Sequence, residues 1–153
     1  MELEERRRLA VECFNRTWTL LERSARSPEE DDEMLHGAHA SRYHWGEVGT
    51  AANRARGEWQ CSRVYAVLGR AEPALHHARR CREICESAPD ELADWDLPFA
   101  YEALARAHLL AGDAREAQGW LDRARESLAG IADEEDRALL ESDLASIAPV
   151  PAG

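Results

Sequence analysis

The chain has 153 residues and a formal net charge of −11 at pH 7, and charged side chains make up 32% of it. This length suits one domain, and the acidic balance disfavours nucleic acid or an anionic membrane surface as partner, because both are usually bound by basic faces. All 19 residues counted as lysine or arginine are arginine, which excludes Schiff-base lysines and the Walker-type phosphate loop.

Neither a signal peptide nor a membrane anchor is expected. Residues 1–10 are rich in Glu and Arg and have no apolar centre, unlike a secretory signal. No apolar run approaches the roughly 20 residues that a membrane-spanning helix needs. We therefore expect a cytoplasmic protein without membrane contact, whose four cysteines are free thiols.

Helix signals follow one another along the chain. Ser27, with Pro28 and Glu30 behind it, forms a capping box, and Gly49 followed by Thr50 predicts one helix end and the next helix start. A single long helix through Gly49 is the alternative. The predicted helices span about 2–24, 28–48, 51–68, 73–86, 98–111, 114–129 and 134–147, with a loop over 87–97.

No segment alternates in the manner of a strand, so an all-α fold of about seven helices is expected. Residues 1–148 are predicted to form a single domain. Residues 149–153, which contain two prolines, are expected to be a flexible tail.

Two segments carry similar residues at similar helical offsets. The later one consists of Tyr101, Leu104, Ala105, His108, Gly112, Asp113, Ala117, Leu121 and Ala124, and the earlier one of Trp59, Tyr65, Gly69, Ala74, Ala78 and Cys81. The pattern resembles the tetratricopeptide repeat, in which a glycine–aspartate turn separates two helices. The chain also resembles small bacterial proteins of this size. The resemblance implies stacked antiparallel hairpins in a right-handed solenoid with a concave binding surface.

The turn glycines Gly69 and Gly112 are 43 residues apart, whereas the family repeats about every 34. The loop after residue 86 accounts for the excess. Ala105, His108 and Leu121 also depart from the family's usual residues.

The resemblance directs attention to the first helix of each hairpin. Arg56, Trp59 and Arg63 share one face of the third predicted helix, and Glu102 and Arg106 share the corresponding face of the fifth. Such a strip could hold a carboxylate or an acidic peptide, and Trp95 in the loop could act as a lid. The alternative is ion pairing within the stack, for example between Arg54 and Glu58 at i, i+4.

Histidines gather on the second predicted helix. His36, Tyr43 and Glu47 lie within about 40° of one another when viewed down the helix axis, and His39 sits between them and the core. His36, His39 and Glu47 are the candidate ligands, because imidazole and carboxylate bind zinc. A divalent metal site is the hypothesis here, and a polar helix flank is the alternative.

No glycine-rich phosphate loop, nucleophile elbow or Ser/His/Asp set is present, so no catalytic residue is predicted. The leading hypothesis is an interaction module that binds a peptide or partner protein through its concave face. Two alternatives stay open: a metal- or small-ligand-binding protein, which could be an enzyme, and a structural homodimer.

Overall fold

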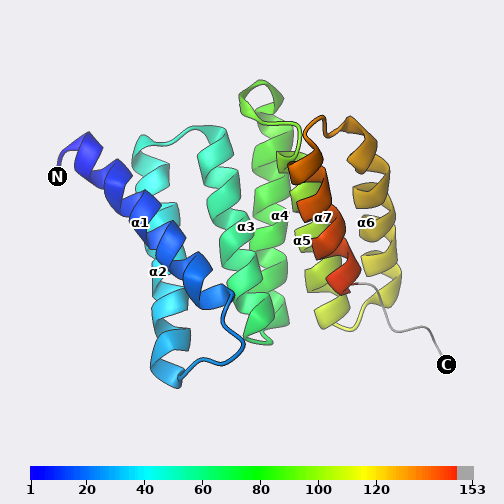
Figure 1. Cartoon of the computed structure of the whole chain (residues 1–153), viewed down its shortest axis with the longest axis horizontal. Helices are drawn as coiled ribbons and strands as arrows, with labels where there is room; N and C mark the ends of the chain where they lie inside the picture. Colours follow the sequence, from blue (N-terminus) through cyan, green and yellow to red (C-terminus); the bar gives the residue numbers. More distant parts are fainter. Residues whose placement is uncertain (148–153) are drawn as a thin grey trace.

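The computed structural model describes residues 1–147, and over this range the chain folds into seven α-helices and two short 3-10 helices (Figure 1). The α-helices are α1 (Leu3–Leu21), α2 (Pro28–Val48), α3 (Ala51–Val67), α4 (Ala71–Ser87), α5 (Asp96–Leu110), α6 (Ala114–Ser127) and α7 (Glu134–Ile147). The 3-10 helices are Pro89–Glu91 and Leu128–Gly130. The described residues form no strand, so the all-α prediction is confirmed for them. The predicted tail 149–153 and residue 148 lie outside the described residues.

The helices begin where side chains satisfy the free backbone N–H groups of a first turn. Ser27 accepts a hydrogen bond from the backbone of Glu30, whose carboxylate accepts one from the backbone of Ser27 in return. Thr50 and Asn53 form the same reciprocal pair before α3. Each exchange satisfies two of the four unpaired donors of a helix start.

Two helices start two residues earlier than predicted. α4 begins at Ala71 rather than Pro73, and α5 begins at Asp96 rather than Pro98. Proline is tolerated there because the first-turn N–H that it lacks would have no partner within the helix. The break at Gly49 is real, and Gly69 and Gly112 close the next two hairpin turns with positive φ angles of 75° and 85°.

The closest packing occurs within consecutive pairs, α1 with α2, α3 with α4, and α5 with α6. The first pair approaches closely because small residues meet there: Ser41 donates to the carbonyl of Ala10 at 2.7 Å, and a Cβ on Gly37 would lie 2.5 Å from Thr17 Oγ1. In Figure 1 the pairs stand side by side from α1 to α6.

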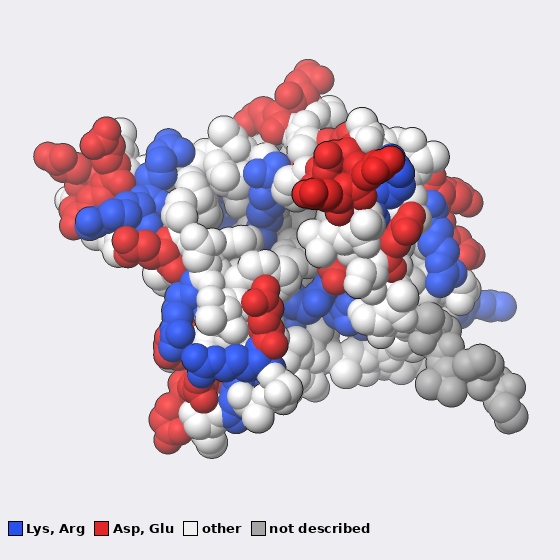
Figure 2. Space-filling model, in the orientation of Figure 1, with Lys and Arg blue, Asp and Glu red and all other residues white. Residues whose placement is uncertain are grey.

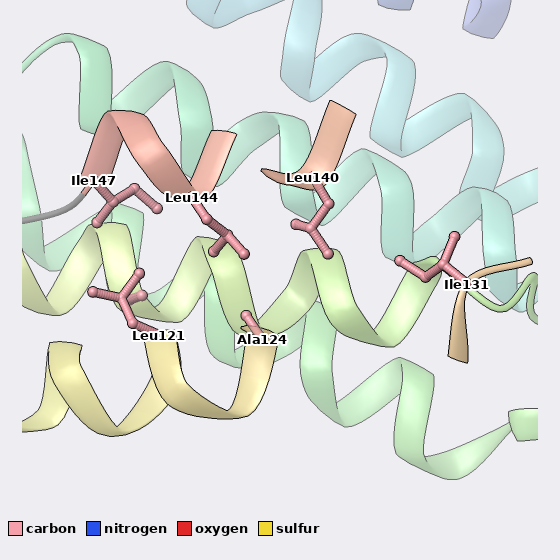
Figure 3. Packing of buried hydrophobic residues seen from close by; sticks show 7 residues of the cluster. Leu121, Ala124, Ile131, Leu140, Leu144 and Ile147 are labelled. Atoms are coloured by element: carbon pink, nitrogen blue, oxygen red, sulfur yellow. The ribbon is translucent and has the colours of Figure 1, made fainter. Parts of the chain in front are cut away.

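Helix α7 covers the last pair. Leu140, Leu144 and Ile147 of α7 pack with Leu121 and Ala124 of α6 in a fully buried cluster (Figure 3). Without α7 these apolar side chains of α6 would face water, so the last helix closes the core at this end. Of the seven helices over residues 1–147, none combines the length and the apolar character that crossing a membrane requires.

Candidate functional site

An open pocket of about 240 Å³ is lined by residues of α1, α3, α4, α5 and α7. We call it the aromatic pocket. Its lining residues are Phe14, Trp18, Ala55, Arg56, Trp59, Cys81, Trp95, Asp96, Phe99, Asp136 and Leu139. Figure 2 shows the surface hollowed between α1 and α7. Side chains from five helices thus line one mainly apolar cavity.

The aromatic rings of the pocket contact one another edge to face. Trp18 meets Trp59 with ring centroids 5.4 Å apart, Trp59 meets Phe99 at 5.9 Å, and Phe99 meets Trp95 at 6.0 Å. Interplanar angles of 78–89° are the geometry that aromatic quadrupoles favour. A continuous series of rings therefore runs from α1 across α3 to the start of α5.

Arg56 fixes one wall of the pocket. Its guanidinium donates to both carboxylate oxygens of Asp96, at 2.8 and 2.9 Å, and lies 4.3 Å from the ring centroid of Trp95. The Asp96 side chain is only 2% exposed and also accepts a hydrogen bond from the backbone of Ala93. The pair joins α3 to the first turn of α5 and holds Trp95 against the pocket.

Glu102 organises a second group of charges behind the pocket. The carboxylate is fully buried and accepts hydrogen bonds from Trp59 Nε1 at 3.1 Å, Arg63 at 2.8 Å and Arg106 at 3.0 Å. Arg63 also pairs with Asp143 of α7 at 3.0 Å. Burial raises the pKa of Asp143, although the positive charge of Arg63 opposes the shift. Side chains of α3, α5 and α7 are thus tied together at one buried carboxylate.

The rim of the pocket on α7 combines an acid with an apolar residue. Leu139 is 56% exposed, and the half-buried Asp136 has no side-chain hydrogen bond or ion pair to any of residues 1–147. Asp136 belongs to a first turn that also contains Glu134 and Glu135. Acidic side chains gather over the beginning of α7 in Figure 2.

The structure brings the predicted groove residues together. Arg56, Trp59 and Trp95 line the aromatic pocket, while Arg63 and Arg106 meet at Glu102 behind it. The arginines, however, are already paired with carboxylates of this chain, so they present no unpaired cation to an acidic ligand.

The alternative interpretation of this strip was ion pairing within the helical stack, and Arg56, Arg63 and Arg106 do form such pairs. The particular pair predicted between Arg54 and Glu58 does not form: Arg54 donates to the carbonyl of Gly49, and Glu58 faces Arg42 and His77.

Sequence reasoning missed several pocket residues. Phe14 and Trp18 are four residues apart on α1, and this spacing marks one apolar face, so they could have been found. Asp96 and Asp136 gave no such signal, because their places depend on how α5 and α7 pack.

The predicted metal ligands lie apart from one another. His36 and Glu47 are exposed and stand eleven positions apart, about 16 Å along the axis of α2. The hypothesis compared angles around the helix and left out the rise along it. His39 points into the protein, where its Nε2 lies 2.9 Å from the hydroxyl of Tyr65.

A different group of metal-binding side chains converges beside His39. The ligand atoms of Glu58, Cys61 and His77 all lie within 4.8 Å of one another. No other set of three or more His, Cys, Asp or Glu residues among residues 1–147 converges in this way. Burial acts to raise the pKa of Glu58, but the hydrogen bond from His77, at 3.2 Å, and the charge of Arg42 lower it overall. Burial raises the pKa of Cys61 to about 12, and burial beside His77 lowers the pKa of His39.

The remaining cysteines form no disulfide. All four are free, and Cys81 and Cys85 are buried within one cluster between α3, α4 and α5. A hydrogen bond with Cys85 and, after it, burial raise the pKa of Cys81, so it is a neutral thiol at neutral pH. These side chains pack as small apolar groups.

Fold and site together define an all-helical protein of packed helix pairs with an aromatic pocket between its first and last helices. No protein-family model matches the chain, and no curated protein or solved structure is significantly similar to it.

Proposed function

We propose that this chain is a protein-interaction module, a tetratricopeptide-like stack of helical hairpins whose concave face binds a peptide segment of a partner protein. One large apolar side chain of that segment occupies the aromatic pocket, and a neighbouring Arg or Lys faces Asp136. The aromatic pocket is the observation that carries this proposal.

The size of the pocket favours a single side chain over a cofactor. Its volume is about 240 Å³, below the roughly 300–1,000 Å³ typical of small-molecule sites. Peptide recognition commonly depends on a few buried anchors, and tryptophan and arginine are enriched where such anchors bind. Three tryptophans and one arginine line this pocket.

Rigid walls also support an anchor site. The pairing of Arg56 with Asp96 and the contacts of Trp59 with Glu102 and Phe99 hold the rings in place before any ligand arrives. A preformed pocket reduces the entropy lost on binding.

Charge decides which peptide fits best. The arginines of the face are paired internally, whereas Asp136 has no partner for its carboxylate within residues 1–147. A cation beside the anchor would gain an ion pair with Asp136, and the net charge of −11 would favour its approach. We further propose that the protein acts in the cytoplasm, where its four cysteines would stay reduced as free thiols.

Selection of random peptides displayed on phage against the purified chain tests this proposal. We expect the enriched sequences to share one aromatic or long aliphatic residue next to Arg or Lys. In fluorescence polarisation with such a peptide, Leu139→Arg should weaken binding at least about tenfold, because it removes an apolar rim and repels the cation. Asp136→Asn should weaken binding a few-fold and reduce its salt dependence.

Leu110→Arg is the matched control. Leu110 is 40% exposed and lies on a second, more open hollow with Val67, away from the aromatic pocket. Equal losses for Leu139→Arg and Leu110→Arg, or enrichment of acidic peptides, would contradict the proposal. A second copy of the chain as the occupant would appear as a dimer in analytical ultracentrifugation that Leu139→Arg dissociates.

A further inference from the structure

We propose that Glu58, Cys61 and His77, with His39 as fourth ligand, form a zinc site that joins α2, α3 and α4. The site is separate from the aromatic pocket and does not depend on peptide binding. It lies between the first and second helix pairs, since its residues come from α2 (His39), α3 (Glu58 and Cys61) and α4 (His77).

The distances between the side chains suit a tetrahedral ion. Zinc binds nitrogen and oxygen at about 2.0–2.2 Å and sulfur at about 2.3 Å, which places neighbouring donor atoms about 3.3–3.6 Å apart. His77 Nδ1 lies 3.2 Å from Glu58 Oε2, and Cys61 Sγ lies 3.9 Å from His39 Nδ1. The three donors of Glu58, Cys61 and His77 all lie within 4.8 Å of one another. His39 lies outside this group, so its ring must move toward Glu58 or His77 for all four side chains to bind one ion.

The helices aim these donors at one place. Glu58 and Cys61 are three residues apart, and residues at this spacing neighbour each other on a helix surface. The rings of His39 and His77 approach from the two flanking helices, with centroids 5.3 Å apart. Cys61 is fully buried and Glu58 is 7% exposed, so the site excludes most water.

The surroundings fit a metal-binding histidine. Such a histidine usually donates its second ring N–H to a neighbouring group that fixes the ring. With Nδ1 of His39 facing Cys61, its Nε2 lies 2.9 Å from the hydroxyl of Tyr65. The Tyr65 ring also stacks on His77, with an interplanar angle of 5°.

The charges of the site balance. Zinc binding releases the thiol proton of Cys61 to solvent, and the resulting thiolate and the carboxylate of Glu58 together neutralise the ion. Arg42 lies 3.6 Å from Glu58 Oε2, and its buried Nε has no hydrogen-bond partner. Both His77 and Arg42 face Oε2 of Glu58, so zinc binding at this oxygen requires Arg42 to pair with Oε1 instead.

Cobalt(II) and zinc titrations of untagged protein, purified without metal columns, test the proposal. We expect one ion per chain in native mass spectrometry and, with cobalt, the visible bands of a tetrahedral ion together with a thiolate charge-transfer band. Zinc at a free concentration one hundred times its Kd should raise the melting temperature by roughly 5–10 °C. Cys61→Ala should abolish the charge-transfer band, and His77→Gln should weaken zinc binding at least about a hundredfold.

His76→Gln is the matched control, because His76 is the exposed neighbour of His77 on the same helix. It should leave zinc affinity and the cobalt spectrum unchanged. An octahedral cobalt spectrum without a thiolate band, or zinc affinity that His76→Gln lowers as much as His77→Gln, would mean an adventitious ion only and would overturn the proposal. The spectrum of the unmodified chain decides the question even if a variant folds poorly.

Discussion

Replacing Glu102 by glutamine is expected to lower the free energy of unfolding by about 3–5 kcal/mol, a large share of the roughly 5–15 kcal/mol typical of a domain. The carboxylate is fully buried and accepts hydrogen bonds from Arg63, Arg106 and Trp59. Glutamine has nearly the same shape but no charge, so two arginines with little exposure lose their shared counter-ion. Urea unfolding followed by circular dichroism measures the loss.

Glu141→Gln is the control for this prediction. Glu141 is an exposed acid of α7 whose side chain makes no hydrogen bond or ion pair with residues 1–147. Its replacement should change stability by no more than about 0.5 kcal/mol. If Glu102→Gln cost as little as Glu141→Gln, the buried network could not be what ties α3, α5 and α7 together.

Replacing Arg56 by methionine should cost about 2–3 kcal/mol. Methionine keeps much of the apolar stem, but the carboxylate of Asp96, 2% exposed, loses both of its hydrogen bonds to the guanidinium. The expected cost is below that of Glu102→Gln because the Arg56 side chain is 34% exposed, so water already screens part of the interaction. Thermal and urea unfolding give the value.

A second substitution separates the charge from the packing. In the Arg56→Met background, Asp96→Asn removes the unpaired charge while the side-chain oxygen can still accept from the backbone of Ala93. We expect the double variant to be more stable than Arg56→Met by about 1 kcal/mol or more. Hydrogen exchange over residues 88–97 should speed up in Arg56→Met, since Trp95 loses its stacking partner. If the losses of stability from Arg56→Met alone and Asp96→Asn alone simply added up in the double variant, the two side chains would not be directly paired.

Most helix starts were predictable because their signals are local, whereas the first helix, expected to reach about residue 24, ends at Leu21. Ser27 and Thr50 each accept a backbone hydrogen bond at the helix start that they were expected to cap. The two-residue errors at Pro73 and Pro98 have a local origin as well, since proline is compatible with any position of a first turn.

The site was predictable only as far as helical periodicity reaches. Helical periodicity predicted that Arg56, Trp59 and Arg63 share one face of α3, and in the structure all three side chains lie on the face toward α5. The counter-ions Asp96 and Asp143 come from other helices, so no pattern within α3 could reveal that the arginines are neutralised.

The metal hypothesis shows the same limit of local reasoning. His36 and Glu47 share an angular sector of α2 but not a height along it, whereas His39 meets Cys61 and His77 from two other helices. Convergence between helices depends on their packing, which one-dimensional spacing does not contain.

The five tryptophans allow the most direct test of the aromatic pocket as a peptide site. Trp18, Trp59 and Trp95 line the pocket, whereas Trp45 contacts Arg7 and Trp120 stacks on Tyr101 elsewhere. We would record the assigned indole N–H signals by two-dimensional NMR while adding the tightest peptide from the display selection. The account predicts shifts for the three pocket indoles and unchanged signals for Trp45 and Trp120. Shifts confined to Trp45 or Trp120, with the pocket indoles unmoved, would contradict it.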